Sequence, residues 1–120
     1  MAKLDIDGNE LVLRLSSMEK LGAMHDDIRV PLTSIRSVRV IRDPWTERRG
    51  VRAPGTGWPG RVALGTWRGS FGRDFRAVFR HGPAVVVELQ GAQFQRLVVS
   101  DDDAEATAAR LSGHVAGPAS

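Results

Sequence analysis

The chain has 120 residues, of which 42% are hydrophobic and 26% are charged, and it contains no cysteine. This length suits one domain with one core, and the composition is that of a globular protein. The lack of cysteine excludes disulfides, thiolate metal sites and cysteine nucleophiles. No apolar run approaches the roughly 18 residues that a membrane-spanning helix needs. We therefore expect one domain over residues 1–115 with a flexible tail at 116–120, a cytoplasmic location and no transmembrane segment.

The net charge of +3 is distributed unevenly along the chain. Residues 36–80 contain eleven arginines against three acidic residues, which is a local excess of eight positive charges. A concentrated positive charge raises the local concentration of anionic partners. The middle of the chain is therefore the first place to look for a binding surface.

The N-terminal third predicts short strands and one short helix. Residues 4–7 and 10–15 flank Gly8-Asn9, a turn sequence typical of a β-hairpin. Ser16 is followed three residues later by Glu19, which predicts a capped helix that ends at Gly22.

The next segments indicate two further strands. Residues 27–32 predict a short strand that ends at a proline, and residues 34–42 predict a longer strand. The apolar side chains of this longer strand, Ile35, Val38 and Val40, do not share one parity, so we expect a β-bulge.

Between residues 43 and 60 the alternation stops. Four glycines and three prolines interrupt the segment, which predicts a long irregular connection. It also carries Trp45 and Trp58, and exposed indoles need a partner or a fold-back contact. We therefore expect residues 44–60 to be mobile or to pair with another chain. Pairing with a second copy of this chain would give a homo-oligomer through this segment.

The C-terminal half predicts strands at residues 61–68 and 74–80, joined by a glycine turn, and a hairpin over 84–89 and 94–100. A helix should follow, with Asp101 or Asp102 as its N-cap. The expected core between hairpin and helix consists of Val85, Val87, Leu89, Leu97, Val99, Ala108 and Leu111. These elements predict a mainly β fold: an antiparallel barrel of about seven strands with a short helix in the N-terminal half and a C-terminal capping helix.

Parts of the chain resemble a known family. The segment Val30-Pro31-Leu32-Thr33-Ser34-Ile35, the turn Val98-Val99-Ser100-Asp101-Asp102 and the alanine-rich last helix are similar to bacterial pleckstrin-homology-like domains. Ala104 stands where that family's pattern has proline. The segment that carries Pro44-Trp45 and the glycines up to Gly60 also resembles actinobacterial proteins of unknown function. The resemblance implies the barrel fold and supports the fold better than any activity.

Several chemistries lack the residues they need. His25, His81 and His114 are too widely spaced for a metal motif, so neither a metal nor a cofactor is expected. Residues 55–60 share glycines with a dinucleotide fingerprint, but a strand follows them where that fingerprint needs a helix. His25 with Asp26 and Asp27, and His81 alone, fit solvated turns better than catalytic groups.

The strongest candidate site is the arginine-rich middle of the chain. A guanidinium group binds phosphate or carboxylate with two parallel hydrogen bonds, and indoles supply stacking surfaces. Asp74 is expected as a buried partner of one arginine. A solubilising arginine-rich surface is the other interpretation. The candidate ligand-binding residues are Trp45, Arg48, Arg49, Arg52, Trp58, Arg61, Trp67 and Asp74.

Two functions follow, and the sequence alone does not assign the ligand. The first is a non-catalytic binding module whose arginine- and tryptophan-rich loop faces an anionic or protein partner. The alternative is a small barrel enzyme of lyase or cyclase type that acts on a hydrophobic metabolite, with arginine, Asp74 or His81 polarising a carbonyl. Arginine and aspartate side chains that point into a cavity would favour the enzyme. Nucleic acid is not favoured, because no helix-turn-helix, zinc finger or aromatic RNA-binding strand is visible.

Overall fold

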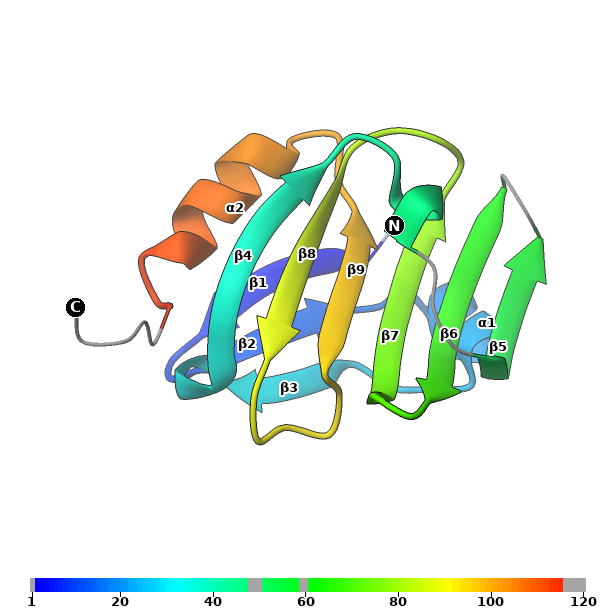
Figure 1. The fold of residues 1–120 in the computed structure, drawn as a ribbon, viewed down its shortest axis with the longest axis horizontal. Coiled ribbons are helices and arrows are strands. Elements are labelled where there is room, and N and C mark those ends of the chain that lie inside the picture. Colours follow the sequence, from blue (N-terminus) through cyan, green and yellow to red (C-terminus); the bar gives the residue numbers. More distant parts are fainter. Residues whose placement is uncertain (1, 48–50, 59–60, 116–120) are drawn as a thin grey trace.

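The computed structural model describes residues 2–47, 51–58 and 61–115, with the backbone alone at 46–47 and 51–54. Two sheets lie one behind the other (Figure 1). The smaller sheet has the order β1-β2-β3, with β1 at Lys3–Asp7, β2 at Glu10–Arg14 and β3 at Ile28–Pro31. The larger sheet has the order β4-β8-β9-β7-β6-β5, with strands Ile35–Ile41, Ala84–Leu89, Arg96–Ser100, Gly72–Phe79, Val62–Gly69 and Val51–Trp58.

The mainly β prediction is confirmed, but the described strands do not close into a barrel. There are nine of them in the described part of the chain, where about seven were expected, and they form two separate sheets. The prediction of a wholly antiparallel fold is also wrong, because β9 pairs parallel with β7 and antiparallel with β8. The β8–β9 hairpin places β9 directly beside β7. Because β9 runs in the same direction as β7, these two strands pair in parallel.

Helix α1, Ser17–Ala23, begins as the sequence predicts. Ser16 Oγ accepts a hydrogen bond from the Glu19 backbone N–H, and Glu19 Oε1 accepts one from the Ser16 backbone N–H. Its predicted end is wrong: Gly22 lies inside the helix, and Met24 caps it in the left-handed conformation at φ +53°. Gly22 is used for packing instead, since a Cβ there would lie 3.1 Å from Leu64 Cδ2. Glycine therefore brings α1 close to β6.

The strand predictions of the larger sheet largely hold. The bulge expected in β4 is present as a register shift between Ile35 and Ser37. The hairpin of β8 and β9 forms as expected. Side chains of β6 alternate between the two faces of the sheet, because Leu64 belongs to the main core whereas Ala63 and Trp67 belong to the opposite face.

The prediction of a long irregular connection over residues 43–60 is wrong. A 3-10 turn, η2, occupies Pro44–Glu47, and β5 occupies Val51–Trp58 and pairs antiparallel with β6. The prolines and glycines concealed this strand. Pro54 sits where the β5–β6 register shifts between Arg52 and Gly55, and proline is tolerated at such an irregularity of an outer strand.

The main core lies between the two sheets and against helix α2, Ala104–Ser112. The seven core residues expected from the last hairpin and helix are all buried. The helix start is a correction: Asp103 is its N-cap and makes no side-chain cap bond, while Asp101 accepts hydrogen bonds from the Asp103 N–H and the Thr107 hydroxyl. Arg110 Nη2 donates to the Leu4 carbonyl at 3.0 Å, which ties α2 to β1.

Neither described helix has the length and apolar character needed to cross a membrane. The tail predicted at residues 116–120 lies outside the described residues.

Candidate anion-binding edge

Three connections meet at one end of the larger sheet, at the top in Figure 1. The Arg80 backbone N–H donates to the Arg61 carbonyl at 2.7 Å, which joins the turn after β7 to the turn before β6. Trp45 Nε1 donates to the Arg80 carbonyl at 2.8 Å, which adds η2 to the same cluster. We call this cluster the arginine–tryptophan edge, and its members are Trp45, Trp58, Arg61, Arg80 and His81.

Trp45 is held in place at both its backbone and its ring. Its backbone N–H donates to Asp43 Oδ1 at 3.1 Å, and its ring centroid lies 6.1 Å from that of His81. The half-buried indole also packs on a second apolar cluster that includes Val78, Val86 and Val98. Trp45 therefore presents a fixed ring edge rather than a freely rotating side chain.

Trp58 and Arg61 form the outer part of the edge. The guanidinium carbon of Arg61 lies 5.5 Å from the ring centroid of Trp58, within the distance at which a cation is attracted to an aromatic face. Trp58 is 63% exposed. An aromatic face and a guanidinium are therefore both accessible to a partner here.

Arg80 adopts a left-handed backbone conformation with φ +59°. This conformation is uncommon for residues other than glycine, and residues that adopt it cluster at functional sites. The hydrogen bonds to Arg61 and from Trp45 fix the Arg80 backbone on both sides. The exposed side chain of Arg80 therefore extends from a turn whose backbone is held by hydrogen bonds.

The charges of this edge are poorly balanced by acids. Asp43 lies here, with His81 Nδ1 at 3.2 Å from its Oδ1. Within the described part of the chain, the side chains of Arg61 and Arg80 form no ion pair. Arg42 is placed differently, because it lines a depression together with Asp102, Asp103 and Glu105. The smaller sheet differs, because Arg29 reaches both Asp7 and Glu10, at 3.1 and 3.3 Å. Positive charge is therefore left uncompensated at the arginine–tryptophan edge.

Trp67 and Asp74 lie on the outer face of the larger sheet, opposite the main core. They are cross-strand neighbours, and Asp74 has no exposed surface, so its predicted burial is confirmed. Arg76 follows on the same face of β7, is 1% exposed, and donates from Nη1 to the Pro44 carbonyl at 3.3 Å. Its guanidinium carbon is 6.0 Å from the Trp67 ring centroid. Arg76 thus connects this face to the segment that carries Trp45.

The sequence did not indicate the role of Arg76 or of the charged residues that lie beside it on the sheet, which are Arg39, Glu88 and Arg96. Arg96 aligns with both Asp74 and Glu88 across the sheet, and its Nη2 lies 2.9 Å from Glu88 Oε2. Arg39 approaches the same Glu88 oxygen at 3.6 Å. The period of two along β7 could have placed Arg76 beside Asp74, but the strand order that brings Arg96 and Glu88 there is not visible in the sequence.

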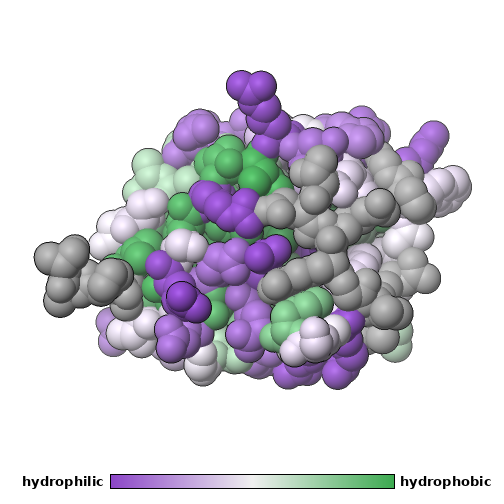
Figure 2. Space-filling view, in the orientation of Figure 1, coloured by the Kyte–Doolittle hydropathy of each residue, from purple (hydrophilic) through white to green (hydrophobic). Residues whose placement is uncertain are grey.

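Of the eight predicted ligand-binding residues, the structure brings Trp45, Trp58 and Arg61 together at the edge, while Trp67 and Asp74 lie on the adjoining face. Arg48 and Arg49 lie outside the described residues. Arg52 is described by its backbone, which pairs with Trp67. Figure 2 shows hydrophilic side chains along the upper margin, above a hydrophobic area of the same face.

The histidines divide between two environments. His81 is exposed, as the sequence predicts. His25 departs from the expected solvated turn, because it is half-buried with its ring centroid 5.6 Å from those of both Phe75 and Phe94. Across the described residues, no group of three or more histidine, aspartate and glutamate side chains is arranged to hold a metal ion.

Comparisons of the chain with protein-family models, curated proteins and solved structures gave no match. The resemblance to pleckstrin-homology-like domains therefore stays a prediction, and the function has to be argued from the site itself.

Proposed function

We propose that this chain is a non-catalytic binding module whose arginine–tryptophan edge receives a partner that carries carboxylate or phosphate groups. The observation that carries the proposal is the convergence of Arg61 and Arg80 beside two indoles, without an ion pair to any described acid. Guanidinium groups bind both kinds of anion with paired hydrogen bonds.

The rigidity of the edge supports binding. The backbone hydrogen bonds at Arg80 and the anchored ring of Trp45 hold the edge before a partner arrives. Preorganised groups lose less conformational freedom on association, which increases affinity. Trp58 adds an exposed apolar surface of the type enriched at binding hot spots.

The orientation of the buried charges supports a module more than an enzyme. The enzyme hypothesis needs arginine and aspartate side chains that point into an enclosed cavity. Asp74 and Arg76 instead lie on the face of β7 opposite Phe75 and Ala77, whose side chains belong to the main core. Apolar side chains fill the space between the sheets.

The proposal is tested by removing charge from the edge. In the variant Arg61→Gln, we expect binding to poly-glutamate and to inorganic polyphosphate to weaken about tenfold, which is about 1.4 kcal/mol. Folding stability should be nearly unchanged, because exposed charges contribute only about 0 to 1 kcal/mol. Arg80 is kept, since a substitution there would alter backbone strain as well as charge.

The matched control is Arg14→Gln, which removes the same charge from the smaller sheet. There Arg14 lies 3.2 Å from Asp5. Binding should fall more in the edge variant than in the control, and wild-type binding should weaken as salt is raised. Equal losses in both variants, or no binding by the wild type at low salt, would overturn the proposal.

A further inference from the structure

The bulge of β4 brings two neighbouring side chains to the same face of the larger sheet. The register shifts between Ile35 and Ser37, and Ser37 pairs with Glu88, so Arg36 is the extra residue of the bulge. Ile35 and Val38 both pack in the main core, and the two residues between them, Arg36 and Ser37, are exposed. In a regular strand one of these two side chains would turn toward the core. The bulge therefore directs both of them to the outer face.

Arg36, Ser37 and Glu88 line one hollow of about 350 Å³. It lies where β4 begins and β8 ends, at the opposite end of the larger sheet from the arginine–tryptophan edge (Figure 1). Its volume falls within the range of about 300–1,000 Å³ that is typical of small-molecule sites. Bulges are frequent next to functional sites, where they redirect a side chain. The hollow is therefore a second place where this chain can receive a ligand.

Glu88 does not neutralise Arg36, because its carboxylate already faces two other arginines. Glu88 Oε2 lies 2.9 Å from Arg96 Nη2 and 3.6 Å from Arg39 Nη2. Among the residues that the structure describes, the Arg36 side chain forms no ion pair, and neither the Ser37 hydroxyl nor Glu88 Oε1 forms a hydrogen bond. The hollow therefore offers a guanidinium and a hydroxyl as donors and one carboxylate oxygen as an acceptor.

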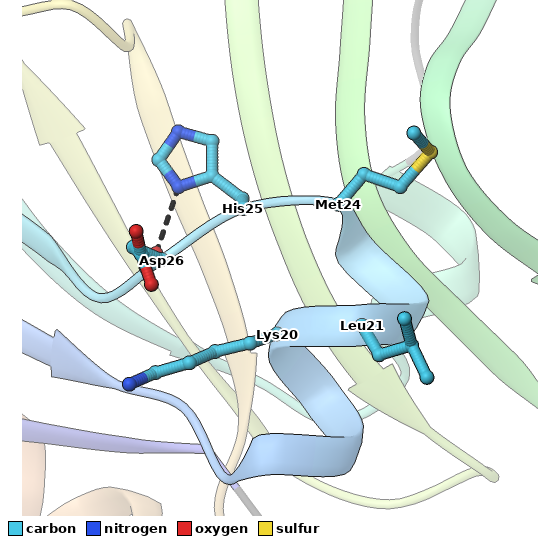
Figure 3. A pocket seen from close by; sticks show the side chains of 5 residues that line it. All are labelled: Lys20, Leu21, Met24, His25 and Asp26. Carbon is cyan, nitrogen blue, oxygen red and sulfur yellow. Dashed lines mark hydrogen bonds between the residues drawn. The ribbon is translucent and has the colours of Figure 1, made fainter.

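The hollow beside α1 lacks this set of donors. Its volume is about 620 Å³, and Figure 3 shows its polar side chains on one side and its apolar side chains, Leu21 and Met24, on the other. Its lysine, Lys20, lies 3.8 Å from Asp27. The exposed carboxylate of Asp26 would repel an anion. Its positive charge is therefore already paired, whereas that of Arg36 is not.

We propose that the hollow at the β4 bulge binds a small phosphate ester that also carries hydroxyl groups. Its phosphate accepts two parallel hydrogen bonds from Arg36 and a third from the Ser37 hydroxyl. Glu88 Oε1, which can only accept, receives a hydrogen bond from a hydroxyl group of the same ligand. A single uncompensated arginine suits one phosphate group rather than a polymer of them. This site is separate from the arginine–tryptophan edge and does not depend on the function proposed there.

The first test is a titration of the full chain with glycerol 3-phosphate, followed by NMR of the backbone amides. Saturable shifts should appear at residues 35–38 and 86–89. Arg36→Gln should weaken binding about tenfold, because it removes the charge-assisted hydrogen bonds, and Ser37→Ala should weaken it less. The controls Arg14→Gln and Ser70→Ala, the same changes at exposed sites elsewhere, should bind as the wild type does. Absence of saturable shifts at these amides, or equal losses in the controls, would overturn the proposal.

The second test changes the ligand and leaves the protein as it is. n-Propyl phosphate has the phosphate and the carbon chain of glycerol 3-phosphate without its hydroxyl groups. It should bind several-fold more weakly, because Glu88 Oε1 then faces no donor. Equal affinities for the two esters would remove Glu88 from the site and contradict the ligand class.

The two proposed sites can fail independently. Arg61→Gln should bind glycerol 3-phosphate as the wild type does, whereas Arg36→Gln should bind poly-glutamate as the wild type does. If each variant lost both ligands to the same extent, the two arginines would act only through general positive charge, and a separate site at the bulge would be ruled out.

Discussion

Asp5 lies on β1, where its carboxylate accepts the Ile6 backbone N–H at 2.9 Å and Arg14 Nε at 3.2 Å. The backbone bond and then the Arg14 bond lower the pKa of Asp5 from its usual value of 3.8, because both favour the ionised form. A carboxyl group with a lowered pKa in the folded state stabilises the fold above its unfolded pKa. That contribution is lost as the pH falls through the folded pKa.

Asp5→Asn should therefore lower stability at neutral pH by a small amount, and the difference from wild type should disappear in acid. Urea unfolding at a series of pH values from neutral to below 3.8 measures this difference. Asp26→Asn removes the same charge from an exposed side chain and is the control. A difference for Asp5→Asn that is constant over the whole pH range would contradict the assignment.

The burial and contacts of a single residue could be predicted only where the neighbouring sequence carried the information. Asp74 was expected to be buried because it is an isolated acid among arginines, and it is buried. Arg76 has the same parity on the same strand, yet nothing in the sequence shows that the Pro44 carbonyl reaches it. The meeting of Trp45 with Arg80 joins positions 35 residues apart, and such a pair follows from topology alone.

At the scale of elements, local chemistry identified α1 and the hairpins. The serine cap of α1, the Gly8 turn and the alternation of β8 are each complete within a few residues. Strand β5 had no such signal, because Pro54 and two glycines interrupt its sequence and its regular pairing with β6 is visible only in the structure. The error affected the site, since β5 carries Trp58 to the arginine–tryptophan edge and Thr56 to α1.

Gly55 shows why β5 needs glycine. It has φ +148°, and a Cβ there would lie 2.3 Å from the Leu64 carbonyl oxygen. Gly82 has the same φ, but a Cβ there would meet no atom within 4 Å. Both positions carry the backbone strain of a left-handed conformation, and the steric clash is specific to Gly55.

Gly55→Ala should therefore destabilise the protein more than Gly82→Ala, by about 1–3 kcal/mol, the usual cost of overpacking. Chemical denaturation of both variants gives this difference directly. Equal losses of stability would mean that β5 shifts away from β6 without cost, and that the close approach at Gly55 is not needed for the fold.

At the scale of the molecule, the sequence predicted a β-rich fold with a terminal helix but not how the strands associate. Alternation along a strand tells which side chains share a face, and it does not tell which strand lies beside it. The separation into two sheets and the parallel contact of β9 with β7 depend on contacts between distant segments. The barrel expectation failed for this reason, whereas the expected core residues were right.

Helix α2 connects the two sheets. Leu111 is fully buried in the main core, and α2 packs against β4 and β8 of the larger sheet. The bond from Arg110 to Leu4 reaches β1 of the smaller sheet. If α2 couples the sheets, removing buried volume from it should weaken both together.

Leu111→Ala should lower the free energy of unfolding by about 2–5 kcal/mol, the range for truncating a buried leucine. Leu21→Ala, the same change at an exposed site, should stay within about 0.5 kcal/mol in dilute solution. Tryptophan fluorescence follows the larger sheet, because Trp45, Trp58 and Trp67 all lie on it or against it, and amide exchange in β1 and β2 follows the smaller sheet. Both probes should report the same loss, as one cooperative transition requires. Loss of protection in β1 and β2 without a matching change in fluorescence would show that the smaller sheet unfolds separately.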